Sequence, residues 1–197
     1  MNPFSQLQQA ISRRKLMAIS KKNKVKRENV GYQNAEHIGV LIYSDLNNSS
    51  QAIHEFLYKL HKDKKKYSVL LYKDKLNHLK LTHEHIFITH KDLNWLGKSI
   101  NKVTDKFIRT PFDILYCLND SLPAPFEYIL AGSLARFRIG RYVEDKAWFY
   151  DFMIDTKGNN NIDFYINPTK MNLVYIITNL ISAKVGEQTT EISKELV

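Results

Sequence analysis

The strongest constraint on the fold is an alternation of short apolar runs with amphipathic segments along the middle of the chain. Residues 37–43 (HIGVLIY) and 67–72 (YSVLLY) are continuous apolar runs, which are typical of strands buried on both faces. Between them, residues 51–62 carry apolar side chains at helical spacing. The sequence therefore predicts a βαβ unit in which the two strands are parallel.

The same alternation continues beyond this unit and predicts a single three-layer, Rossmann-like α/β domain with a mostly parallel sheet of five or six strands. In the predicted helix 99–109, Ile100, Val103 and Phe107 are expected to face the core. The further predicted strands are 85–89, 112–118, 137–142 and 148–155, and the further predicted helices are 99–109, 125–134 and 169–184.

The positive charge is concentrated at the N-terminus. The first 30 residues hold eight basic residues and one acidic residue, so they carry +7 of the net charge of +9. Asn2 and Pro3 predict the start of a short helix, and residues 20–30 (SKKNKVKRENV) predict an extended or mobile segment. We divide the chain into a basic arm (1–35), an α/β domain (36–186) and a flexible tail (187–197).

The basic arm points to an anionic partner. Contacts of Lys and Arg with phosphates give affinity without sequence readout, so RNA or a ribonucleoprotein is the favoured target. An anionic membrane surface is the alternative, with Phe4, Leu7 and Ile11 inserted, and a purely solubilising tail is the third reading. RNA binding should then disappear on deletion of residues 1–30. The predicted contacts are Arg13, Arg14, Lys15, Lys21, Lys22, Lys24, Lys26 and Arg27.

The carboxyl edge of the sheet is the second candidate site, because ligands of open α/β sheets bind there. Asp45, Asp120 and Asp155 follow predicted strands, and Arg141 ends another, so these four are weak catalytic or ligand-binding candidates. Residues of these types also cap helices and form turns after strands. No glycine-rich phosphate loop follows the first strand, which disfavours a dinucleotide or P-loop enzyme. We predict no cofactor, and a non-enzymatic role is preferred.

Several other groups have structural explanations. Residues 78–90 are rich in histidine, but we interpret these side chains as solvated and predict no metal site. Cys117 lies in an apolar run and is expected to be a buried free thiol. One of Asp151 and Asp155 is expected to pair with Arg136, Arg138 or Arg141, and Arg136 with Arg138 could alternatively contact an anion. Since no run of about eighteen apolar residues occurs, we expect a cytoplasmic protein without a transmembrane segment.

The sequence LNDSLPAPFEYILAGSLARFRIGRY, followed by FYDFMID, resembles a bacterial family of short α/β proteins that is a domain of unknown function. The resemblance spans residues 36–183 and implies an α/β fold in a bacterial cytoplasm. The segments FDILYCLND and SLARFRIG resemble, more distantly, the N-terminal domain of heptosyltransferase-type glycosyltransferases. That second resemblance implies a glycosyltransferase-like domain or a domain that binds a nucleotide or sugar.

Overall fold

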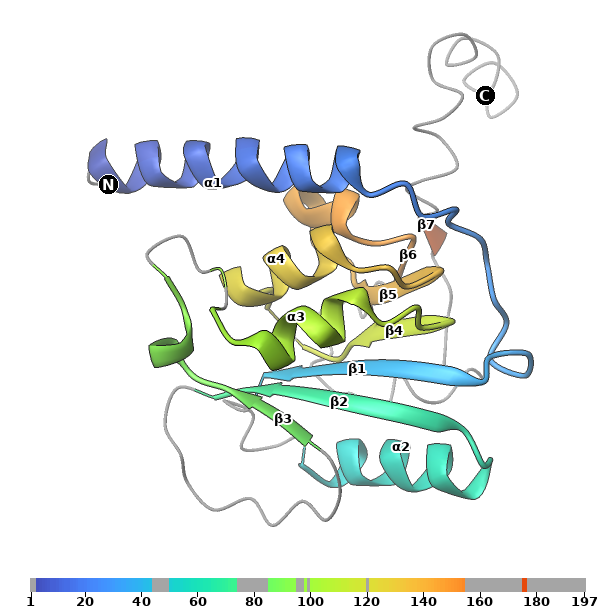
Figure 1. Ribbon diagram of the computed structural model, residues 1–197. Helices are drawn as coiled ribbons and strands as arrows, with labels where there is room; N and C mark the ends of the chain where they lie inside the picture. The colour runs from blue at the N-terminus through green and yellow to red at the C-terminus, as the bar shows by residue number, and fades with distance from the viewer. Residues whose placement is uncertain are drawn as a thin grey trace, which may run out of the picture.

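The computed structural model describes residues 3–43, 50–73, 85–94, 98, 100–119, 121–154 and 175–176. Within them, seven strands form one sheet in the order β3-β2-β1-β4-β5-β6-β7 (Figure 1). Strands β1 to β6 pair in parallel, whereas β7 pairs antiparallel with β6. The predicted Rossmann-like α/β fold is therefore confirmed. The strands are β1 (His37–Tyr43), β2 (Lys66–Tyr72), β3 (His85–Ile88), β4 (Ile114–Cys117), β5 (Phe137–Arg141), β6 (Phe152–Ile154) and β7 (Tyr175–Ile176).

Strand β1 lies in the middle of the sheet and is buried on both faces. Successive strand side chains point to opposite faces, so Val40 and Ile42 enter one hydrophobic cluster while Leu41 between them enters the other. No polar face is available to such a strand. This is the physical reason why a continuous apolar run predicted β1 correctly from its first residue to its last.

Helices cover both faces of the sheet (Figure 1). The helix α2 (Ser50–Lys62) packs Ile53, Phe56 and Leu60 into the cluster on one face. On the other face lie α3 (Lys102–Arg109) and α4 (Ala124–Gly132), followed outward by α1 (Pro3–Lys22), which runs across α4. The three predicted layers are present, and α1 adds a further helix outside them.

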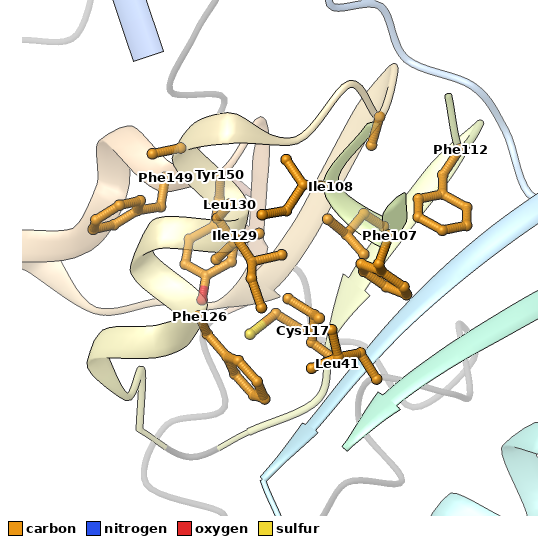
Figure 2. Close-up of a cluster of buried hydrophobic side chains, with 14 of the residues drawn as sticks. Leu41, Phe107, Ile108, Phe112, Cys117, Phe126, Ile129, Leu130, Phe149 and Tyr150 are labelled. Carbon is orange, nitrogen blue, oxygen red and sulfur yellow. The ribbon is translucent and has the colours of Figure 1, made fainter. Parts of the chain in front are cut away.

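The hydrophobic cluster between the sheet and the helices α3 and α4 contains several large buried aromatic side chains (Figure 2). Phe107 and Phe126 come from the two helices, while Tyr150 reaches in from the chain before β6, with its hydroxyl near Cys117. Cys117 is a buried free thiol, as predicted. Burial raises the pKa of this thiol to about 11, so it stays protonated near neutral pH.

The helix α3 is shorter than predicted, and its buried face differs in part from the predicted one. It begins after Asn101, whose side chain accepts a hydrogen bond from Val103 N at 2.9 Å and so caps the helix. Ile100 therefore lies before the helix and is 68% exposed, and Val103 is 47% exposed. Phe107 faces inward as predicted, and Thr104 and Ile108 share its helical face.

The strand predicted over 148–155 begins later in the structure. Trp148 and Phe149 end the 3-10 helix η2 (Glu144–Phe149), and β6 starts at Phe152. Phe149 and Tyr150 are consecutive, yet both are buried in the cluster beside α4. Two successive residues of a strand cannot enter the same cluster, so the chain must turn here.

The described part of the predicted helix 169–184 is strand β7, so the helix prediction is wrong at Tyr175 and Ile176. These residues are aromatic and β-branched, and pairing with β6 satisfies the backbone groups along that edge. The rest of that segment and the predicted tail 187–197 lie outside the described residues. Among the helices that the structure describes, none is long and apolar enough to cross a membrane.

Candidate functional site

The cations of the basic arm are held on a fixed scaffold. Helix α1 continues through Lys22, and residues 23–30 follow it without regular structure. Seven of the eight predicted contacts have exposed side chains, whereas Arg27 is largely buried. The exposed seven are Arg13, Arg14, Lys15, Lys21, Lys22, Lys24 and Lys26.

Arg27 attaches the basic arm to the turn after α4. Its guanidinium donates hydrogen bonds to the backbone oxygens of Ala135 and Ser133, the latter at 2.8 Å. Burial, together with the positive charge of Arg138, lowers the pKa of Arg27 to about 10, although Asp151 offsets part of the shift. Arg27 remains charged at neutral pH, but its donors are engaged inside the protein and not presented at the surface.

Asn23 and Leu16 complete this attachment. The Asn23 side chain donates to Ser133 O at 2.7 Å, which satisfies a carbonyl just beyond the C-terminal end of α4. Leu16 is buried in the same cluster as the α4 residues. The sequence predicted that residues 20–30 do not pack, but the free carbonyls after α4 give this polar segment its binding partners.

A second contact joins the basic arm to the amino ends of β4 and β5. Glu28 accepts a hydrogen bond from Arg136 Nε at 2.9 Å, and Arg136 Nη1 donates to Asp113 at 2.9 Å. Asp113 also accepts from His37 N at 3.0 Å. Arg136, which could have contacted an anion, is therefore occupied by two carboxylates.

Arg138 forms an ion pair with Asp151, which is one of the pairings that the sequence left open. The two side chains are 3% and 5% exposed, and Arg138 Nε and Nη2 donate to the two carboxylate oxygens at 2.9 and 3.0 Å. Arg138 Nη1 donates to Leu130 O at 3.1 Å, and Asp151 also accepts from Arg138 N. This bidentate, buried pair joins β5, α4 and the chain before β6, and it makes Arg138 structural.

Two grooves run between α1 and the α3/α4 layer, with volumes of about 460 and 400 Å³. Both are lined by Ile19 of α1 and Tyr128 of α4. We call them together the basic groove, because five basic side chains and one carboxylate occur among their described lining residues. The charged lining residues are Lys22, Lys24, Asp105 and Arg109 in the larger part, and Lys15 and Lys98 in the smaller part.

The domain itself supplies part of this groove. Arg109 ends α3, and Lys98 precedes that helix, with its ammonium 5.4 Å from the centre of the Tyr128 ring. Sequence reasoning missed these three residues, because Lys98 and Arg109 lie far from the arm in the chain. The helical spacing of α4 gave a signal, since Tyr128 falls between its buried positions Phe126 and Ile129.

At the carboxyl edge of the sheet, the structure describes one of the four candidate residues. Three of the four candidates, Asp45, Asp120 and Asp155, lie outside the described residues, so their predicted convergence stays a prediction. Arg141 ends β5 and is half-buried. Farther along this edge, on β1 and β2, the rings of Tyr43 and Tyr72 stack with centroids 5.4 Å apart.

Asn119 joins the ends of β1 and β4 at this edge. Its amide nitrogen donates to Leu41 O at 3.3 Å and to Cys117 Sγ at 3.2 Å, and its oxygen accepts from Tyr43 N. Since both ends of this buried amide are already bonded, its observed role is structural.

The histidine-rich segment falls mostly outside the described residues, including His78 and His83. His90 is exposed at the start of the short 3-10 helix η1 (His90–Asp92). In the parts of the chain that the structure describes, no three His, Cys, Asp or Glu side chains gather in a way that could hold a metal ion.

Comparison with known proteins gives one match. The model of a family described as "Family of unknown function (DUF6913)" matches residues 8–193, which include most of the basic arm. No curated protein and no solved structure matches the sequence. The more distant resemblance to heptosyltransferase-type glycosyltransferases is therefore without support.

Proposed function

The chain belongs to the DUF6913 family, a family of unknown function, and we propose that it is a non-enzymatic RNA-binding protein whose basic arm contacts the phosphate backbone. The observation that carries this proposal is the set of seven exposed cations on α1 and residues 23–30, which are attached to a nearly neutral domain. The proposal includes a bacterial cytoplasmic setting, with which the buried free thiol of Cys117 agrees.

A packed basic helix favours binding more than a mobile tail of the same charge does. Ordering a flexible segment on binding costs conformational entropy, which a preformed helix has already lost. Arg27 and Asn23 fix the C-terminal end of α1 to the domain. Lys21 and Lys22 therefore hold a defined position relative to the domain, and this geometry favours a ligand that contacts both.

Substitution of exposed cations is a better test of this proposal than deletion of the basic arm. Deletion of residues 1–30 would remove Leu16 and Val30, which are buried, and Arg27, which is hydrogen-bonded to Ala135 and Ser133. Loss of binding would then not separate charge from folding. Substitutions of exposed cations leave those buried side chains in place.

We expect the triple variant Arg13→Gln, Arg14→Gln and Lys21→Gln to bind RNA roughly tenfold more weakly at physiological salt, because three phosphate contacts are lost. The slope of log K against log salt should fall by about 2 for single-stranded RNA. Fluorescence anisotropy with labelled RNA over a salt series measures both quantities.

The matched control removes the same charge from the other face of the sheet. The variant Lys62→Gln, Lys64→Gln and Lys66→Gln changes exposed lysines at the end of α2 and the start of β2. It should keep native affinity and salt slope. If both triple variants lose the same affinity for RNA, net charge alone explains the effect and the proposal is contradicted. Binding of phosphatidylserine vesicles without binding of RNA would also contradict it.

A second candidate function is binding of a nucleotide or sugar at the carboxyl edge. The strand order places a switch point between β1 and β4, where ligands of such sheets bind. We expect a nucleoside diphosphate or nucleotide-sugar at roughly 100 times its Kd to raise Tm by about 5–10 °C. The variant Arg141→Gln should lose this shift, which differential scanning fluorimetry measures. A native chain that gives no shift with any such ligand would remove this candidate.

A further inference from the structure

We propose that the basic groove is the binding seat for single-stranded RNA, with Tyr128 as a stacking surface and Lys98 and Arg109 as phosphate contacts from the domain. This inference rests on the proposed function. It adds the class of RNA that the protein selects, and it extends the binding surface beyond the basic arm to α3 and α4.

The charges around the groove come from two parts of the chain that meet only in the folded protein. Lys22 and Lys24 belong to the basic arm, whereas Lys98 and Arg109 flank α3. Asp105 is the acidic group among the described lining residues, so cations dominate the charge of the groove. A ligand that lies along the groove thus passes cations from both parts, as a phosphate backbone requires.

The uncharged lining of the groove combines apolar and aromatic residues with the polar Ser12, Asn23 and Asn94. Ile19, Ile108 and Leu134 line it, and the half-buried Tyr128 contributes to both of its parts. Lys98 Nζ lies 5.4 Å from the centre of the Tyr128 ring, so one position offers a positive charge and an aromatic ring together. Proteins that bind single strands combine these two elements, with rings for the bases and cations for the backbone.

This lining distinguishes a single strand from a duplex. The parts of the groove, at about 460 and 400 Å³, are within the range of roughly 300–1,000 Å³ that accepts a small organic group. An unpaired base can enter such a space and contact Tyr128. In a duplex the bases are stacked and paired inside the helix, so only the phosphates would reach the lysines and the apolar lining would stay unused.

The test compares an oligouridine of about 12 nucleotides with an RNA duplex of similar length, both fluorescently labelled. We expect the native chain to prefer the single strand about tenfold, since one stacked base contributes a factor of roughly 5 to 150. Tyr128→Leu should remove this preference and leave duplex binding unchanged. Tyr128→Phe keeps the ring and should bind as the native chain does.

Arg109→Gln tests the contribution of the domain cations. We expect it to weaken oligouridine binding several-fold and to lower the salt slope by about 0.7. Photo-crosslinking of the native complex gives a readout that needs no variant. Mass spectrometry should find uridine attached to a peptide that contains Tyr128.

The outcomes separate this inference from the proposed function. If Tyr128→Leu and Arg109→Gln bind oligouridine as the native chain does while the arm triple variant is weakened, the groove is not the seat and the proposed function stands. Tighter binding of the duplex, or crosslinks confined to peptides without Tyr128, would also overturn the groove. A native chain that binds neither RNA overturns both.

Discussion

Replacement of Asp151 by Asn is expected to lower the free energy of unfolding by about 3–5 kcal/mol, because it leaves the Arg138 guanidinium buried without a counter-charge. For a chain of this size, that loss corresponds to a fall in Tm on the order of 10–15 °C. Urea denaturation followed by circular dichroism measures the change. Such a loss is a large part of the roughly 5–15 kcal/mol that stabilises a typical domain.

Two controls identify the buried charge as the cause. Lys59→Gln removes a surface pair of similar length, 2.7 Å to Asp63, and should leave the urea midpoint nearly unchanged. The double variant Arg138→Met and Asp151→Asn removes both charges and should recover part of the lost stability. A double variant whose loss equals or exceeds the sum of the single losses would contradict this explanation.

Gly140→Ala is expected to be the second most damaging single change. A Cβ at this position in β5 would lie 2.5 Å from Cζ of Tyr150 and closer still to Cε1. Tyr150 is 3% exposed inside the core drawn in Figure 2, so its ring has little room to move away. We expect a loss of about 3 kcal/mol in the free energy of unfolding, at the upper end of the effects of overpacking.

The control for this change is Gly31→Ala, where an added Cβ meets no atom within 4 Å. Its effect should stay within about 0.5 kcal/mol. In addition, Gly140→Ala should cost less in a Tyr150→Leu background than in the native chain, because the clashing ring is gone. If the loss is the same in both backgrounds, contact with Tyr150 is not its cause.

The accuracy with which the sequence predicted each element depends on how that element is buried. Strand β1 is buried on both faces, so its apolar run predicted it without error. The helix α2 has one apolar stripe, and its spacing predicted all but the first residue. For α3, the apolar spacing predicted a start at residue 99 because it included the exposed Ile100, and it missed the cap at Asn101.

The candidate site was less predictable because it depends on contacts between distant parts of the chain. The sequence identified the cations of the basic arm, but it gave no reason to assign Arg27 a different role from Arg14. That difference comes from the carbonyls of Ser133 and Ala135, more than a hundred residues away. An ion pair within residues 136–155 was predictable because the arginines and aspartates are close in sequence, but the sequence did not single out Arg138 and Asp151.

The attachment of the basic arm also has a consequence for synthesis of the protein. Asn23 is 110 residues from Ser133 in the chain, so its hydrogen bond forms only after α4 has been translated. Contacts of such long range form late and slow the folding of a domain. During translation the first 30 residues therefore leave the ribosome well before their docking surface exists. The basic arm is therefore synthesised well before the surface on which it packs.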